Sequence, residues 1–332
     1  MSIEKQAFGA AEKYTIRGAQ DLSVGILTYG ATIQEIRFRG TDVALGYSAL
    51  EDYQEMEGYL GATVGRYANR IAGGKFTLNG ISYDVGCNEK GRGHLHGGVI
   101  GLSHKFWRAE ILSGTELRCT ALLEDGEEGY PGEMRVSVTF TVDGNILRLT
   151  YEAASSRDTV FNPTNHCYFN LNGQNGAPVT NHLMQLNARA YTPVDERLIP
   201  TGEIRPVRGT PFDFESPKPI GRDLDAADPQ LRLGGGYDHN FVLQGSGLKQ
   251  AAAVSSPLTG IAMECHTTMP GIQFYTANCL HNPKGKSGPM GPRQGFCLET
   301  QFFPDSPNHP SFPSAVLRAG EAFRSVTEYR FT

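Results

Sequence analysis

The stretch MRVSVTFTVDGNILRLTY, residues 134–151, alternates apolar and polar side chains on both sides of a central Asp143-Gly144-Asn145 turn. Successive side chains of a β-strand point to opposite faces, so this alternation predicts two strands that each bury one face. Glycine and asparagine at the centre accept the backbone angles of a tight reversal. The stretch therefore predicts a long antiparallel hairpin.

The same pattern recurs elsewhere in the chain. Phe76 and Leu78 precede Asn79-Gly80, and alternating apolar residues follow, which predicts a second hairpin. Gly or Pro interrupts most windows with helical periodicity. We therefore expect an all-β fold, a large antiparallel sandwich or barrel-like double sheet. Several prolines gather over residues 192–237, where we expect long surface loops.

The composition fits a single domain over residues 1–332 that is rich in turns. The chain holds 40 Gly and 19 Pro, and its hydrophobic content of 39% is enough for a substantial core. A formal net charge of -5 gives no electrostatic reason to expect nucleic acid or an anionic membrane as a partner. Without an apolar leader or a run of about 18 apolar residues, a cytoplasmic location is expected. The six cysteines form no CxxC pair, so we expect free thiols.

Two histidines flank a leucine in HLHGG, residues 94–98. On a strand, His94 and His96 would share one face. Such a pair can bind a metal, with His104 as a further ligand, or it can place one imidazole in a site and the other in a structural hydrogen bond. The spacing offers no convincing third and fourth ligand, so a metal-dependent enzyme is the weaker alternative.

One histidine and one carboxylate lie inside apolar-aromatic runs. His166 is surrounded by asparagines that can satisfy a buried polar network or fix the orientation of the imidazole. Glu299 lies in FCLETQFF, residues 296–303, without an obvious local cation. Burial of such a carboxylate is costly unless it is paired or functional. Each residue alone also has an ordinary structural explanation.

Six stretches taken together resemble the aldose 1-epimerase family, the galactose mutarotases. They follow one another in family order and cover nearly the whole chain: GRYANRIAGGKF (65–76), HLHGG (94–98), NPTNHCYFNLNG (162–173), GYDHNF (236–241), GIQFYT (271–276) and LETQFFPDSPNHPSFP (298–313). A single motif is weak evidence, but six in order are specific. The resemblance implies a β-supersandwich fold, with no metal and no organic cofactor.

The resemblance also implies the chemistry, which is interconversion of the α- and β-anomers of a free aldose such as galactose or glucose. By motif position it makes His166 the general acid and Glu299 the general base. It assigns the sugar hydroxyls and the ring oxygen to Asn69, Arg70, His96, Asp238 and Gln273. The expected partner is a monosaccharide, bound by a monomer or a homodimer.

The acid needs help to stay protonated, because the reference pKa is about 6.5 for His and about 4.3 for Glu. A neighbouring carboxylate, either Glu299 or Asp238, would supply it, so we expect a raised pKa for His166. Besides a metal-dependent sugar isomerase built on His94 and His96, the sequence leaves two alternatives open. One is a non-catalytic sugar-binding module, and the other is a relative acting on phosphorylated hexose, for which Arg66 and Arg70 would be the cations.

Overall fold

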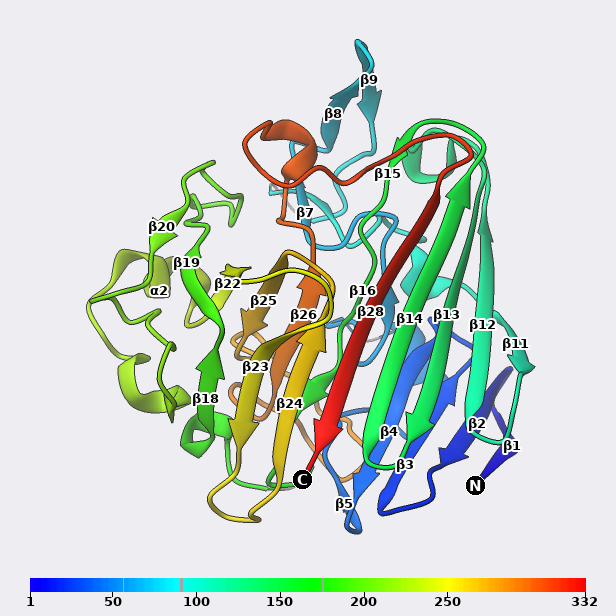
Figure 1. Cartoon of the computed structure of the whole chain (residues 1–332), viewed down its shortest axis with the longest axis vertical. Helices are drawn as coiled ribbons and strands as arrows, with labels where there is room; N and C mark the ends of the chain where they lie inside the picture. The colour runs from blue at the N-terminus through cyan, green and yellow to red at the C-terminus, as the bar shows by residue number, and fades with distance from the viewer. Residues whose placement is uncertain (56, 90–91, 175) are drawn as a thin grey trace.

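A computed structural model describes residues 1–55, 57–89, 92–174 and 176–332. Its strands pair antiparallel, and two sheets lie against each other over the N-terminal part of the chain. In Figure 1 the blue strands β2–β4 lie behind the green strands β12–β14, and β12 contacts β2 while β13 contacts β3. The all-β antiparallel fold expected from the alternation is confirmed.

Three sheets make up most of the molecule. The five-stranded sheet has the order β1 (Ser2–Phe8), β2 (Ala11–Arg17), β3 (Leu22–Leu27), β4 (Thr32–Phe38) and β5 (Thr41–Asp42). The nine-stranded sheet has the order β11 (Arg108–Ile111), β12 (Glu116–Leu123), β13 (Met134–Asp143), β14 (Ile146–Ser155), β28 (Ala322–Phe331), β24 (Ala262–Thr267), β23 (Lys249–Ser255), β18 (Leu183–Leu186) and β21 (Lys218–Pro219). The six-stranded sheet has the order β17 (Tyr168–Phe169), β26 (Phe296–Gln301), β25 (Gly271–Tyr275), β22 (Asp238–Leu243), β19 (Ala188–Tyr191) and β20 (Arg205–Pro206).

The remaining strands form short pairs. These are β6 (Thr63–Val64) with β16 (Thr164–Asn165), β7 (Arg70–Ala72) with β10 (Gly93–Leu95), β8 (Lys75–Leu78) with β9 (Ile81–Asp84), and β15 (Thr159–Val160) with β27 (Val316–Leu317). Within the described residues the α-helices are α1 (Leu50–Glu55) and α2 (Pro229–Gly234). Single 3-10 turns span Leu102–His104, Glu127–Gly129, Val179–Asn181, Ile220–Asp223 and Ser306–Asn308.

Both predicted hairpins are present. In the longer one, β13 pairs with β14 along its whole length, from Met134 opposite Ser155 to Asp143 opposite Ile146. In the shorter one, Asn79 and Gly80 have φ values of 52° and 78°, so both central residues lie in the left-handed region that a tight primed turn demands. Asn79 and Gly80 therefore form the tight turn that the sequence predicts.

The prediction of surface loops over residues 192–237 is wrong in part. This segment has little regular structure, yet Phe212 and Phe214 are fully buried. Phe212 stacks on Tyr191 with ring centroids 4.3 Å apart, and Phe214 meets Tyr237 edge to face. Prolines exclude regular strands but not burial, because an irregular segment can still pack aromatic rings against a sheet. These rings lie against the six-stranded sheet and support β22 and β25.

Two further expectations can be compared with the structure. All six cysteines are free thiols, as expected, with Cys87 and Cys279 exposed and the other four buried. Among the described residues, no helix is long and apolar enough to cross a membrane.

Candidate active site

The six-stranded sheet provides the carboxylate side of the site. Glu299 lies on β26, directly opposite Gln273 on β25, so the two side chains share a face of the sheet. Gln273 Nε2 donates a hydrogen bond of 2.7 Å to Oδ1 of Asp238 on the next strand. β26 is buried on both faces, which explains why its sequence shows no alternation, and Glu299 is only 2% exposed. Three polar residues predicted as site residues thus meet on one face.

His166 lies in the connection between β16 and β17, and its backbone is fixed on both sides. Its N–H donates to the carbonyl of Ala62, and its carbonyl accepts from the N–H of Gly61. The imidazole Nε2 lies 3.7 Å from Oε1 of Glu299, and the Tyr168 ring stacks on the imidazole at a centroid distance of 5.0 Å. The structure therefore brings the predicted acid and base together.

Two mutual hydrogen bonds hold His96 and Asn69 together beside His166. The His96 N–H donates to the Asn69 carbonyl at 3.0 Å, and the Asn69 N–H donates to His96 Nδ1 at 3.1 Å. Both residues have positive φ, 50° for His96 and 61° for Asn69. Because Nδ1 accepts a hydrogen bond, the proton of neutral His96 lies on Nε2. The His96 ring lies 5.1 Å from the His166 ring, so His96 brings an N–H donor to the site.

Arg70 supplies the positive charge of the site. Its Nε and Nη2 donate to the two carboxylate oxygens of Glu89 at 2.6 and 2.7 Å. This bidentate geometry fixes the guanidinium plane. Burial lowers the pKa of Arg70, but the Glu89 pair and the charges of Asp238 and Glu299 more than offset burial and raise it overall. Arg70 therefore remains a fixed cation beside the two buried carboxyls.

Burial dominates the electrostatics of the acid and the base. It raises the pKa of Glu299 well above its usual value, and the negative charge of Asp238 adds to this, while Arg70 opposes it. It lowers the pKa of His166 to about 4. The expected raised pKa of His166 is therefore wrong, because loss of hydration disfavours the charged imidazole. Burial favours the neutral form of both groups in the free site.

His94 does not share the site with His96. Its Nε2 lies 2.7 Å from the hydroxyl of Tyr130, and its Nδ1 lies 3.2 Å from the carbonyl of Gly86. The strand β10 ends at Leu95, and the left-handed turn at His96 sends the two imidazoles in different directions. Of the two arrangements open from the sequence, the structure has the one with a single imidazole in the site.

A metal could be held by donor atoms of His96, His166 and Glu299, which all lie within 4.8 Å of one another. The hydrogen bond at His96 Nδ1 argues against this, because the other nitrogen then carries a proton and offers no lone pair. His104, the third ligand considered from the sequence, instead lies 3.0 Å from the hydroxyl of Ser103. The donor set thus fits a polar organic ligand better than a metal ion.

Arg66 is not part of the site. It is 2% exposed, and its Nη1 donates to the carbonyls of Pro131 and Gly132 at 2.9 Å each. Its guanidinium also lies over the Tyr130 ring at 5.6 Å. These contacts give it a structural role. The two-arginine cluster considered for phosphate binding therefore does not form.

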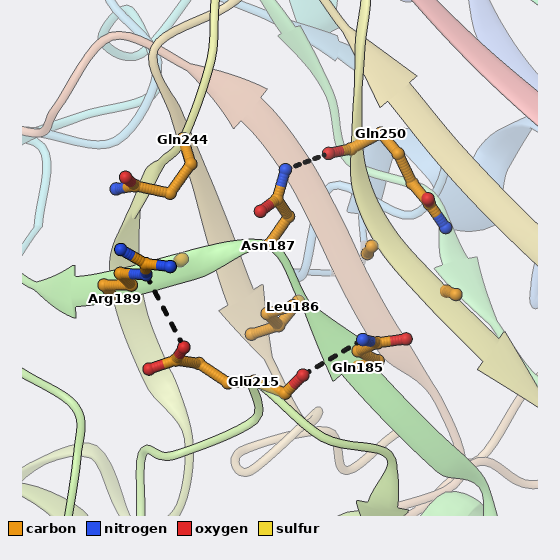
Figure 2. A pocket seen from close by; sticks show the side chains of 10 residues that line it. Gln185, Leu186, Asn187, Arg189, Glu215, Gln244 and Gln250 are labelled. Carbon is orange, nitrogen blue, oxygen red and sulfur yellow. Dashed lines mark hydrogen bonds and ion pairs between the residues drawn. The ribbon is translucent and has the colours of Figure 1, made fainter.

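A separate open groove of about 410 Å³ lies between the crossover from β18 to β19 and the strand β23 (Figure 2). In Figure 2 the Asn187 amide donates to the backbone carbonyl of Gln250, and Arg189 faces Glu215. No histidine lines this groove, and its charged groups pair with each other. It offers no acid and base of the kind that meet at His166.

Sequence reasoning missed several side chains that shape the site. Glu89 lies in a polar loop segment with no signal of its own. Tyr59 lies 4.8 Å from the His96 ring and follows Gly58 in an unremarkable stretch. Cys297, by contrast, precedes Glu299 by two residues on β26. Period-two alternation could have placed it on the face of Glu299.

Comparisons with known proteins identify a family for nearly the whole chain. The family model described as aldose 1-epimerase matches residues 12–330. Galactose mutarotase of Rattus norvegicus is 43% identical, with 98% of this chain and 95% of that protein covered. Aldose 1-epimerase of Escherichia coli (strain K12) is 38% identical, with 96% and 94% covered.

Solved structures share the fold. A galactose 1-epimerase from Lactobacillus acidophilus NCFM has a TM-score of 0.88 at 30% identity and covers 100% of this chain and 98% of its own. An aldose epimerase homologue from C. elegans has a TM-score of 0.89 at 28% identity and covers 97% and 99%. The fold and the site thus define an isomerase acting on carbohydrate. The chain belongs to the aldose 1-epimerase family.

Proposed function

We propose that this enzyme interconverts the α- and β-anomers of a free aldose, with His166 as general acid and Glu299 as general base. The observation that supports the proposal is that buried oxygen atoms at the site lack a hydrogen-bond donor. Within the described residues, Glu299 Oε2 and Gln273 Oε1 are buried without a hydrogen-bond partner. Buried acceptors of this kind are costly unless a ligand satisfies them. The hydroxyls of a sugar are the donors that such a site lacks.

The mechanism needs two proton transfers. Glu299 takes the proton of the C1 hydroxyl while His166 protonates the ring oxygen, and the C1–O5 bond opens. Rotation about C1–C2 then exposes the other face of the aldehyde, and closure reverses the two transfers. A positioned acid and a positioned base, 3.7 Å apart at their nearest atoms, can serve both directions without a change of partner.

The proton must lie on His166 for this reaction, whereas burial favours it on Glu299 in the free site. Substrate can shift this balance. A C1 hydroxyl that donates to Oε2 stabilises the carboxylate, and hydrogen bonds to the charged form lower a carboxyl pKa. The two arrangements hold the same number of protons, so binding need only move one proton between Nε2 and Oε1. Sugar binding thus prepares the pair for catalysis.

The other predicted residues then hold the sugar. His96 provides an N–H donor and Arg70 a fixed cation. Asp238 provides a carboxyl and Gln273 an amide, and the two are hydrogen-bonded to each other. Asn69 acts here by fixing the turn that carries His96. The names of the relatives point to galactose as one substrate, and glucose is the other aldose we expect. A cytoplasmic location and a monomeric or homodimeric state stay predictions.

Polarimetry on freshly dissolved α-D-galactose or α-D-glucose tests the proposal. The purified protein should accelerate the change in rotation in proportion to its concentration, and boiled protein should not. A sugar-binding module on the same fold would bind the sugar and leave the rate at that of buffer. Galactose 6-phosphate, assayed in parallel, separates a free aldose from a phosphorylated one as the preferred substrate.

A further inference from the structure

Tyr59 lies among the residues that the proposed function assigns to the sugar. Its ring centroid lies 4.8 Å from that of His96 and 6.1 Å from that of His166. Burial raises the pKa of its hydroxyl to about 12, and the charges of Glu89 and Arg70 also act on it, so this end of the side chain lies near their ion pair. The side chain therefore extends from the two site imidazoles toward the fixed cation.

The backbone holds the Tyr59 ring in this place. The Tyr59 carbonyl accepts from the N–H of Ala62 at 3.0 Å, which closes a turn, and the backbone of His166 is hydrogen-bonded to Gly61 and Ala62 of the same turn. The φ of Tyr59 is 54°, a left-handed value that is uncommon for a bulky residue. Residues in such conformations gather at binding and catalytic sites, and His96 is another of them here. The turn that positions the acid therefore also positions Tyr59.

A sugar needs an apolar surface as well as hydrogen-bond partners. The hydroxyls of a pyranose can bind polar side chains, but the C–H groups on its two faces cannot. Ligand sites therefore combine apolar or aromatic walls with a few polar groups that fix the orientation of the ligand. The seven residues assigned to the sugar and its chemistry are all polar or charged, so a further residue has to provide the wall.

Tyr59 is the ring beside His166 that best meets this need. Tyr168 stacks on the imidazole and is only 3% exposed, so a sugar cannot lie against it. Tyr59 and Tyr275 are both partly exposed, but among the described residues Tyr275 contacts His166 and not His96. A nitrogen of His96 and a nitrogen of His166 lie within 4.8 Å of each other. A sugar that bonds to both imidazoles therefore lies beside the Tyr59 ring, which contacts both.

We propose that the Tyr59 ring is the apolar wall of the sugar site and packs against a C–H face of the bound pyranose. The inference rests on the proposed function, which supplies the identity of the ligand. The bound sugar and the transition state of ring opening both make this contact, so it strengthens binding and leaves the chemical step unchanged. Loss of the ring should therefore appear in Kd and KM, and kcat should be preserved.

The test uses three variants of the full chain. Tyr59→Leu removes the flat ring and keeps apolar bulk, Tyr59→Phe keeps the ring and removes the hydroxyl, and Tyr83→Leu is the matched control. Tyr83 is also partly exposed, but its ring stacks on Phe76 at 5.3 Å in the hairpin of β8 and β9. Polarimetry on fresh α-D-galactose gives kcat and KM. NMR titration with galactose at anomeric equilibrium gives Kd without net turnover.

In Tyr59→Leu, KM and Kd should each rise about threefold to tenfold while kcat stays within about twofold. Tyr59→Phe and Tyr83→Leu should stay within about twofold of the wild type in all three constants. A fall in kcat of Tyr59→Leu at unchanged KM and Kd would overturn the inference, because the ring would then act on the imidazoles and not on the sugar. An equal rise of Kd in Tyr59→Phe would also overturn it, because the hydroxyl would then hold the sugar.

Intermolecular NOEs in the wild-type protein test the contact without any substitution. With galactose in excess, the ring protons of Tyr59 should show NOEs to C–H protons of the sugar. NOEs from Tyr275 with none from Tyr59 would overturn the inference, even if Tyr59→Leu failed to fold.

Failure of the proposed function gives a different result. If the wild type binds galactose but does not accelerate its mutarotation, the acid–base assignment is wrong, and Kd and the NOEs still decide the role of Tyr59. If the wild type is active and Tyr59→Leu matches it in Kd, KM and kcat, the wall is wrong and the acid–base pair stands. If galactose neither binds nor reacts, both proposals are refuted.

Discussion

His166 Nε2 and Glu299 Oε1 lie 3.7 Å apart in a site where each residue is at most 5% exposed. The distance is too long for a hydrogen bond or a strong ion pair. Burial lowers the pKa of the imidazole to about 4 and raises that of the carboxyl. Burial thus favours the neutral form of each group, and the reactivity of the pair depends on what the sugar donates to Glu299.

Removal of either member should stop the reaction without unfolding the protein. General acid and general base contributions are each worth about 10²–10⁴ in rate. We expect His166→Asn and Glu299→Gln to lose kcat on that scale in the polarimetric assay. Circular dichroism and thermal unfolding provide the control for folding. A folded variant with near wild-type turnover would refute its assignment.

Glu299→Gln should also be more stable than the wild type at alkaline pH. The folded pKa of Glu299 is raised above its unfolded value, so this group costs stability as pH rises from the unfolded pKa toward the folded pKa, and the cost is constant above that. The amide cannot ionise and carries no such cost. The Tm of the variant minus that of the wild type should therefore grow between pH 5 and pH 9. A difference that is flat or shrinks would show that Glu299 is not held protonated.

Arg70 should set the pH at which the carboxyls ionise. Its charge lowers the pKa of both Glu299 and Asp238 against the larger effect of burial. Arg70→Met removes this charge, so both pKa values should rise and the alkaline limb of kcat/KM, which follows the ionisation of Glu299, should move to higher pH. Arg70→Lys keeps the charge but cannot form the bidentate pair with Glu89. The limb of its kcat/KM profile should therefore stay near that of the wild type, while KM rises. If the wild type, Arg70→Met and Arg70→Lys lost activity at the same pH, the effect of the Arg70 charge on the carboxyl pKa values would be refuted.

The fold could be predicted from the sequence because antiparallel strands with one buried face show alternating apolar and polar residues. Met134–Asp143 and Ile146–Ser155 are of this kind. Strand β26 shows no such alternation, since both of its faces are buried. Phe212 was missed for a different reason: neighbouring prolines exclude regular structure, and only tertiary packing decides whether an irregular segment is covered.

The seven residues that the family resemblance assigns to the site lie near one another in the structure, and their roles stay predictions. The electrostatics of the site could not be predicted from the sequence. The protonation of His166 depends on how completely the surrounding rings exclude water, and Tyr59 and Tyr168 come from segments far from Glu299 in sequence. Glu89 also escaped, because its partner Arg70 is 19 positions away and nothing local links the two.

Chelation should leave activity unchanged. His96 Nδ1 accepts a backbone hydrogen bond, so Nε2 carries the proton and cannot coordinate a metal unless that bond is given up. Dialysis against EDTA, followed by the polarimetric assay with and without added Zn²⁺, measures this. Loss of activity on dialysis with recovery on adding metal would favour the metal-dependent isomerase over the acid–base pair.

Glu89→Gln should weaken substrate binding more than turnover. Glu89 holds Arg70 by two hydrogen bonds, and the amide can accept only one of them, so the guanidinium loses its fixed plane. We expect KM to rise about tenfold, close to the loss of one charge-assisted hydrogen bond, with kcat changed by less than about threefold. Polarimetry at several sugar concentrations measures both constants.

Glu110→Gln is the matched control, because Glu110 pairs with Arg118 at 2.7 Å on the exposed face of β11 and β12. An exposed pair of this kind contributes little to stability, because solvent screens it, and it lies outside the site. Its kinetics should equal those of the wild type. If the two variants behaved alike, the Glu89 pair would be an ordinary surface contact. If Glu89→Gln instead lowered kcat at constant KM, Arg70 would act on the transition state rather than on the bound sugar.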